Sequence, residues 1–121
     1  MTTTVNSLAY VRFLNLLGAL RNDPASPQLD PLERELLDLL AQRWADNVKV
    51  TVLEAMHSGV AGMSPSTVHR RLKTLKAAGL IVQVPDDADN RIKYLMPTDR
   101  ARDYYDRLGA ALRSSGQLAA G

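Results

Sequence analysis

The sequence contains no cysteine, and this absence excludes disulfides and any metal site built on thiolates. It is typical of proteins from reducing compartments. Apolar runs are short as well, because none approaches the ~20 residues of a membrane-spanning helix. The N-terminus also lacks the basic start of a secretory signal. With 121 residues, we expect one soluble domain spanning residues 1–121, located in the cytoplasm and without membrane contact.

The chain also has almost no excess of positive over negative charge, but the two signs are unevenly distributed along the sequence. The formal net charge is only +2 although the pI is about 9.2, so the total charge alone does not indicate nucleic-acid binding. Residues 30–46 contain five acids against two arginines, whereas residues 64–79 contain four basic residues and no acid. This contrast predicts a basic face on one element and an acidic face on another.

A first helix is predicted from about Ser7 to Arg21 by its apolar spacing. Its apolar arc is wider than one core-facing stripe requires. The helix is therefore either a central core helix or half of a dimer interface. The side chains that would form such an interface are Tyr10, Phe13, Leu14, Leu17 and Leu20.

Three further helices are predicted by their capping residues. Asp30, Pro31 and Glu33 form a capping box that opens the second helix. Thr51 and Glu54 form another, which opens a short helix ending near residue 57. Ser64-Pro65 opens a helix that Gly79 ends.

The remaining pattern predicts a small β component. A short strand is expected at 48–50, and residues 80–84 and 91–96 read as a hairpin whose tip is 85–90. Thr98 caps a last helix that ends near 113, and 114–121 is expected to be a flexible tail. The predicted fold is mainly α with a small β-hairpin wing. It is a winged helix-turn-helix (48–97) with extra N-terminal helices (7–46) and a C-terminal helix (98–113).

The helix at 64–79 carries the functional signal. Val68, Leu72 and Leu75 form its inward stripe, and the opposite side is polar and basic. Hydroxyl and free N–H groups in the first turn of a helix can donate hydrogen bonds to phosphates, and arginine can donate two hydrogen bonds to guanine in the major groove. A solvated helix face is the alternative. The candidate DNA contacts on this helix are Ser64, Ser66, Thr67, His69, Arg70, Arg71 and Lys73.

The hairpin tip combines three aspartates with Arg91. We expect Asp side chains to cap the turn's own amides, and Asp89 to orient Arg91. Arg91 and Lys93 then point toward a minor groove or flanking phosphates. An ordinary polar turn is the alternative.

The segments 64–68 (SPSTV), 75–81 (LKAAGLI) and 89–91 (DNR) before Thr98 resemble the MarR family of winged-helix regulators. The resemblance covers about residues 48–108. It implies a homodimer on a pseudo-palindromic double-stranded DNA site, with the helix at Ser64 in the major groove and Arg91 in the minor groove. It also implies dimerisation through both terminal helices, which adds Tyr105, Leu108 and Leu112 to the interface.

No catalytic residue, metal site or cofactor is predicted, because the two histidines lie on different elements without a supporting acid or cysteine. A small-molecule effector is compatible with the resemblance, but no residue demands one. We expect a sequence-specific DNA-binding transcriptional regulator and not an enzyme. The alternatives are a winged-helix protein-interaction module and a DNA-binding replication or partition protein.

Overall fold

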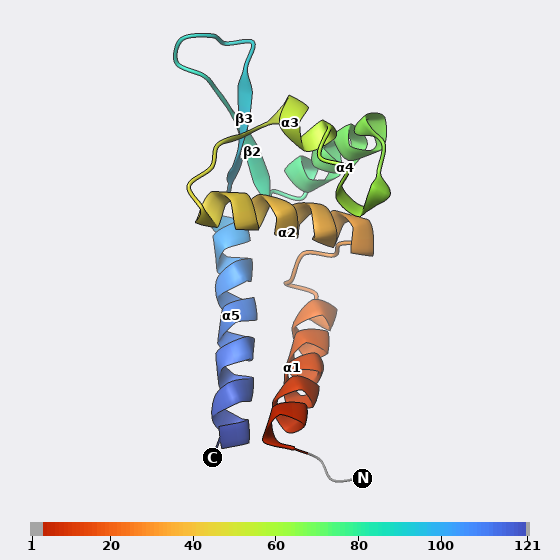
Figure 1. The fold of residues 1–121 in the computed structure, drawn as a ribbon, viewed down its shortest axis with the longest axis vertical. Coiled ribbons are helices and arrows are strands. Elements are labelled where there is room, and N and C mark those ends of the chain that lie inside the picture. Colours follow the sequence, from red (N-terminus) through yellow and green to blue (C-terminus); the bar gives the residue numbers. More distant parts are fainter. Residues whose placement is uncertain (1–3, 121) are drawn as a thin grey trace. The chain divides into compact units, whose positions relative to one another are not determined.

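The computed structural model describes residues 4–120, which form two compact units. One unit is residues 29–101, and the other combines the described residues up to 28 with those from 102 onward. The expected boundaries differ, since the second helix belongs to the unit of the winged helix rather than to the first helix. The elements, drawn in Figure 1, are α1 (Val5–Asn22), α2 (Pro31–Ala45), β1 (Val50–Thr51), α3 (Val52–Met56), η1 (Val60–Gly62), α4 (Pro65–Ala77), β2 (Ile81–Pro85), β3 (Lys93–Pro97) and α5 (Asp99–Ala120).

Side-chain caps start these helices where the sequence predicts them. The Asp30 carboxylate accepts from the Glu33 N–H at 2.8 Å, and Glu33 accepts in return from the Asp30 N–H at 3.1 Å. Thr51 forms the same reciprocal capping box at the start of α3. Ser64 accepts from the third residue of α4, and Thr98 accepts from the Ala101 N–H at 3.2 Å. Each cap satisfies an N–H group that the helix itself cannot pair.

The core of the 29–101 unit lies where α2 and α4 pack together. The predicted inward stripe of α4 is confirmed, because Val68, Leu72 and Leu75 are buried. Burial of each such side chain contributes roughly 1.5–3 kcal/mol to folding. Trp44 joins α2 to the sheet by donating its indole N–H to the Leu95 carbonyl at 2.9 Å. The facing buried residues are Leu36, Leu37 and Leu40 of α2, with Leu80, Ile81 and Leu95 of the wing.

The sheet is antiparallel with strand order β1-β3-β2, and its hairpin is the predicted wing. The strand expected at 48–50 lies instead at Val50–Thr51, where Val50 pairs with Leu95. The hairpin tip is residues 86–92 rather than 85–90, because Pro85 still pairs with Lys93. Proline is tolerated there since β2 is an edge strand and ends at this residue.

The terminal helices differ from expectation at the C-terminal end. α5 continues to Ala120, so the predicted helix end at 113 and the flexible tail from 114 are wrong; Gly121 lies outside the described residues. Ser115 is compatible with the helix because its hydroxyl donates to the Ala111 carbonyl one turn earlier, at 2.7 Å. Among the described residues, no helix combines the length and apolarity needed to cross a membrane.

Candidate nucleic-acid interface

The side of α4 that faces away from the core carries polar and basic side chains and no acidic ones. Ser66, Arg70 and Lys73 are exposed, while Val68 and Leu72 on the opposite side are buried. The segment 64–79 contains no carboxylate, so nothing on the helix itself neutralises this face. A helix surface of this kind can donate hydrogen bonds to phosphates and to the acceptor edges of bases.

The start of α4 gathers the hydroxyl groups that the sequence analysis singled out. The Ser64 side chain accepts from the Thr67 N–H at 3.3 Å and lies 2.9 Å from the Thr67 hydroxyl. The Ser66 hydroxyl is 3.4 Å from that of Ser64. These polar groups stand at the positive end of the helix dipole, which is favourable for an anionic ligand.

Arg71, which the sequence predicts as a DNA contact, does not lie on this exposed face. Its guanidinium donates to the Asp30 carboxylate at the start of α2 and lies 4.0 Å from Glu33. The pKa of Asp30 lies below its usual value because the Glu33 N–H donates to it and Arg71 adds a charged partner. On the helical wheel Arg71 borders the buried stripe, a signal consistent with its role in holding α4 against α2.

The wing holds Arg91 in the way the sequence predicts. Its Nε and Nη2 atoms donate to the two carboxylate oxygens of Asp89, each at 3.0 Å. This fork lowers the pKa of Asp89 and raises that of Arg91. The Arg91 side chain is nonetheless 90% exposed. The arginine is therefore oriented by a planar two-bond contact while its outer edge stays open to a ligand.

Asp86 organises the turn itself, and the prediction that aspartates cap the turn's amides is confirmed. One of its oxygens accepts from the N–H groups of Ala88 and Asp89 at 3.0 and 3.1 Å. Its other oxygen accepts from the Tyr94 hydroxyl at 2.8 Å. Tyr94 is not among the residues predicted from the sequence, and its place is set by its pairing with Val84 across the hairpin.

We expect the Asp86–Tyr94 contact to be visible in the pH titration of Tyr94. The contact raises the pKa of Tyr94 above 10.0, with the hydrogen bond to Asp86 as the main cause, and lowers that of Asp86 below 3.8. The contact therefore stabilises the wing at pH values between the pKa of Asp86 and the pKa of Tyr94. It is lost as the pH rises through the Tyr94 pKa or falls through that of Asp86.

In Asp86→Asn, the pKa of Tyr94 should fall toward 10.0 when the ring is titrated by NMR. Asp87→Asn is the control, because Asp87 is a minor influence on Tyr94. An unchanged Tyr94 titration in Asp86→Asn would show that the contact is not made in solution.

Three of the predicted contacts from different elements meet at one hollow. His69 of α4 and Arg91 and Lys93 of the wing line a cavity of about 480 Å³, together with the exposed Leu53 of α3. Ser64, Ser66, Thr67, Arg70 and Lys73 lie on α4 outside this cavity. The structure thus brings α4 and the wing together at one cavity.

The described residues offer no arrangement for a metal ion. Within residues 4–120, no group of three or more His, Asp or Glu side chains is placed to hold one. His57 instead forms a 3.0 Å hydrogen bond between its Nδ1 and the Leu53 carbonyl.

The candidate dimer residues lie on α1 and α5 and are incompletely covered. α1 contains no buried residue, although much of it is apolar. Tyr10, Leu14 and Leu112 are 62%, 44% and 58% exposed. The other five candidates are half-buried, namely Phe13, Leu17, Leu20, Tyr105 and Leu108.

Comparisons with known proteins agree with this geometry. Residues 58–85, which hold α4 and β2, match the family model of the IclR helix-turn-helix domain. The structure is similar to that of a transcriptional regulator from Thermotoga maritima, with 20% identity, a TM-score of 0.59, and coverage of 91% of this chain and 68% of the other. No match is found among the curated proteins.

Two further structures are similar to the same extent. The heme sensor protein PefR from Streptococcus agalactiae is 19% identical, with a TM-score of 0.58 and coverage of 91% and 69% of the two chains. BpsR from Bordetella bronchiseptica is also 19% identical, with a TM-score of 0.53 and coverage of 92% and 73%. The chain therefore spans about 70% of the length of these proteins and has their winged helix-turn-helix fold.

Proposed function

We propose that this protein is a sequence-specific, double-stranded-DNA-binding transcriptional regulator that acts as a homodimer in the cytoplasm. The observation that carries the proposal is the exposed face of α4, where Ser66, Arg70 and Lys73 stand without a carboxylate. The same helix lies inside the segment that matches a helix-turn-helix domain. The finer resemblance to the MarR family is part of this proposal.

α4 is the element proposed to enter the major groove. Arg70 can donate two hydrogen bonds to guanine, which is the most specific contact available to a single side chain. Lys73 and the hydroxyls of Ser64 and Thr67 suit phosphates, which position the helix without reading sequence. Arg71 is left out of this set because it pairs with Asp30.

The wing is proposed to place Arg91 in the minor groove beside the α4 site. The two bonds from Asp89 restrict the arginine before DNA arrives, so less side-chain entropy is lost on binding. Lys93 follows on β3 and can contact a flanking phosphate. A narrow minor groove attracts arginine because its negative potential is enhanced.

The proposed dimer covers the apolar face of α1 with a second copy of the chain. Exposed leucine and tyrosine on one helix favour such an interface because their burial removes apolar surface from water. Two-fold symmetry then sets the two α4 helices about 34 Å apart, one turn of the duplex, and implies a pseudo-palindromic site. PefR and BpsR respond to heme and to 6-hydroxynicotinic acid, so a small-molecule effector is also compatible with the fold.

Selection from a random duplex library tests the proposal, followed by affinity measurements on the selected site at several salt concentrations. We expect a palindromic consensus and a loss of affinity of about 10³-fold or more between 50 and 200 mM salt, since a dimer should neutralise six or more phosphates. A protein-interaction module would yield no enriched duplex. Enrichment of unrelated sequences with equal affinity would contradict sequence specificity.

A further inference from the structure

The cavity of about 480 Å³ between α3, α4 and the wing contains a group of apolar side chains inside the proposed DNA-binding surface. Its basic residues are the predicted DNA contacts His69, Arg91 and Lys93. Among the described residues, none of those that line this cavity is acidic. The rest of its lining was not predicted to contact DNA and is mainly apolar, namely Thr51, Val52, Leu53, Met56, Gln83 and Ile92.

Leu53 is the most exposed apolar side chain of this cavity. Its exposed fraction is 65%, the highest value among the large exposed hydrophobic residues of the described chain. Ile92, which follows Arg91 at the wing tip, is 39% exposed. Single exposed leucines are common on protein surfaces. Here, however, two exposed apolar side chains and Met56 border one cavity together with basic groups, so the grouping fits a ligand with both charged and apolar parts.

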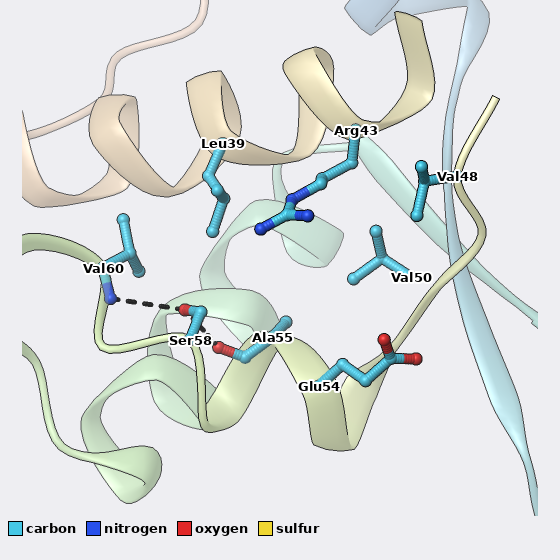
Figure 2. A pocket seen from close by; sticks show the side chains of 8 residues that line it. All are labelled: Leu39, Arg43, Val48, Val50, Glu54, Ala55, Ser58 and Val60. Atoms are coloured by element: carbon cyan, nitrogen blue, oxygen red, sulfur yellow. Dashed lines mark hydrogen bonds between the residues drawn. The ribbon is translucent and has the colours of Figure 1, made fainter. Parts of the chain in front are cut away.

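The packing of α3 holds Leu53 on the side of the helix that faces away from α2. Ala55, on the opposite side of α3, is only 1% exposed. Ala55 and Glu54 border the space between α3 and α2 (Figure 2). The capping box of Thr51 fixes the start of the helix, and α3 also packs on α4. The backbone at Leu53 is therefore fixed by the fold, while its side chain is left largely uncovered.

Duplex DNA presents an apolar group of its own in the major groove, the C5-methyl group of thymine. Apolar side chains contact this methyl group, and the contact distinguishes thymine from cytosine. The proposed function places α4 in the major groove, and Leu53 borders the same cavity as His69 of α4. Leu53 thus lies beside the groove in which the thymine methyl group is exposed.

We propose that Leu53 contacts a thymine methyl group and determines one base position in each half-site. Burial of the methyl group against Leu53 and Met56 removes apolar surface from water. The basic side chains of the cavity bind the neighbouring phosphates, which position the strand without reading its sequence. The proposal rests on the proposed DNA-binding function, and it adds a specificity-determining residue from α3 to those of α4.

Replacement of thymine by deoxyuridine tests the contact, because it removes the methyl group and leaves base pairing unchanged. Each thymine of the duplex selected by the wild-type chain is replaced in turn, and the affinity of the full chain is measured. We expect one position in each half-site at which loss of the methyl group weakens binding about fourfold, the factor that corresponds to ~0.8 kcal/mol for one buried carbon group. Thymines elsewhere should show smaller effects.

Leu53→Ala should remove this sensitivity, so that the variant binds the thymine and deoxyuridine duplexes equally. Its circular dichroism spectrum should be retained because the Leu53 side chain is mostly exposed. Val84→Ala is the matched control. Val84 is also an exposed aliphatic residue, at 43%, but it does not line this cavity. The control should keep the full difference between thymine and deoxyuridine.

Three results would overturn the proposal: no methyl-sensitive thymine with the wild-type chain, the same sensitivity in Leu53→Ala, or unchanged DNA binding by Leu53→Ala. A loss of affinity in Leu53→Ala that is equal for every duplex would also contradict it, since Leu53 would then contact the sugar. A wild-type chain that selects no duplex contradicts the proposed function as well. A selected duplex without a methyl-sensitive thymine contradicts only the role of Leu53.

Discussion

Leu14→Asp is expected to convert the proposed dimer into a folded monomer. Leu14 lies on the apolar face of α1 and is 44% exposed in the single chain, and α1 contains no fully buried residue, so the substitution does not place a charge in the core. In a dimer the new carboxylate would be buried without a partner, which costs several kcal/mol per ion. The molar mass measured by light scattering should fall to that of one chain, 13.3 kDa, while the circular dichroism spectrum is retained.

The same variant should lose most of its affinity for a palindromic site. Two linked half-site contacts bind about 10²–10⁴ times more tightly than one, because the second contact forms without a further loss of translational freedom. Asn15→Asp is the control, since it adds the same charge at an exposed polar position of α1. A Leu14→Asp protein that remains dimeric would remove α1 from the interface, and equal dissociation of both variants would indicate a nonspecific charge effect.

Local signals predicted most of the 29–101 unit. The capping boxes at Asp30 and Thr51 are read from residues three positions apart, and both form as expected. The inward stripe of α4 follows from the helical repeat, and the Asp89–Arg91 contact from a two-residue offset on an extended segment. These features depend on neighbours in sequence, so tertiary structure does not alter them.

Contacts between distant residues were not predictable in the same way. Arg71 lies 41 residues from Asp30, and no spacing rule joins them; only the packing of α4 on α2 does. The Asp86–Tyr94 bond requires the register of the hairpin, and the sequence pattern misplaced the ends of its tip, by one residue at Pro85 and by two at Lys93.

The length of α5 illustrates how a compositional signal can be too weak to end a helix. Small polar residues from Ser114 onward suggested a tail, yet serine can pair its hydroxyl with the carbonyl one turn earlier, as Ser115 does. There is no proline in this stretch to stop the helix. A helix of 22 residues therefore replaces the shorter one expected, which gives the terminal unit more surface for the proposed dimer.

Arg70→Ala is the sharpest test of how the α4 face recognises DNA. If Arg70 donates two hydrogen bonds to a guanine, its loss should cost about 1–3 kcal/mol at the selected site and relax the preference at one base position in each half-site. Affinity for unrelated duplexes should fall much less, because a base contact contributes little to nonspecific binding. Both quantities can be measured by competition binding with single-base variants of the site.

Lys76→Ala is the matched control, because it removes one positive charge from the last turn of the same helix. Lys76 lies about a third of a turn away from Arg70 on the helical wheel. It is nearer to the buried stripe than to the centre of the exposed face. It should lower specific and nonspecific affinity by similar small factors and leave base preference unchanged. If Arg70→Ala behaves in the same way, Arg70 acts only through its charge, and base recognition must come from other side chains of α4, such as Ser66 or His69, because Arg71 is held by Asp30.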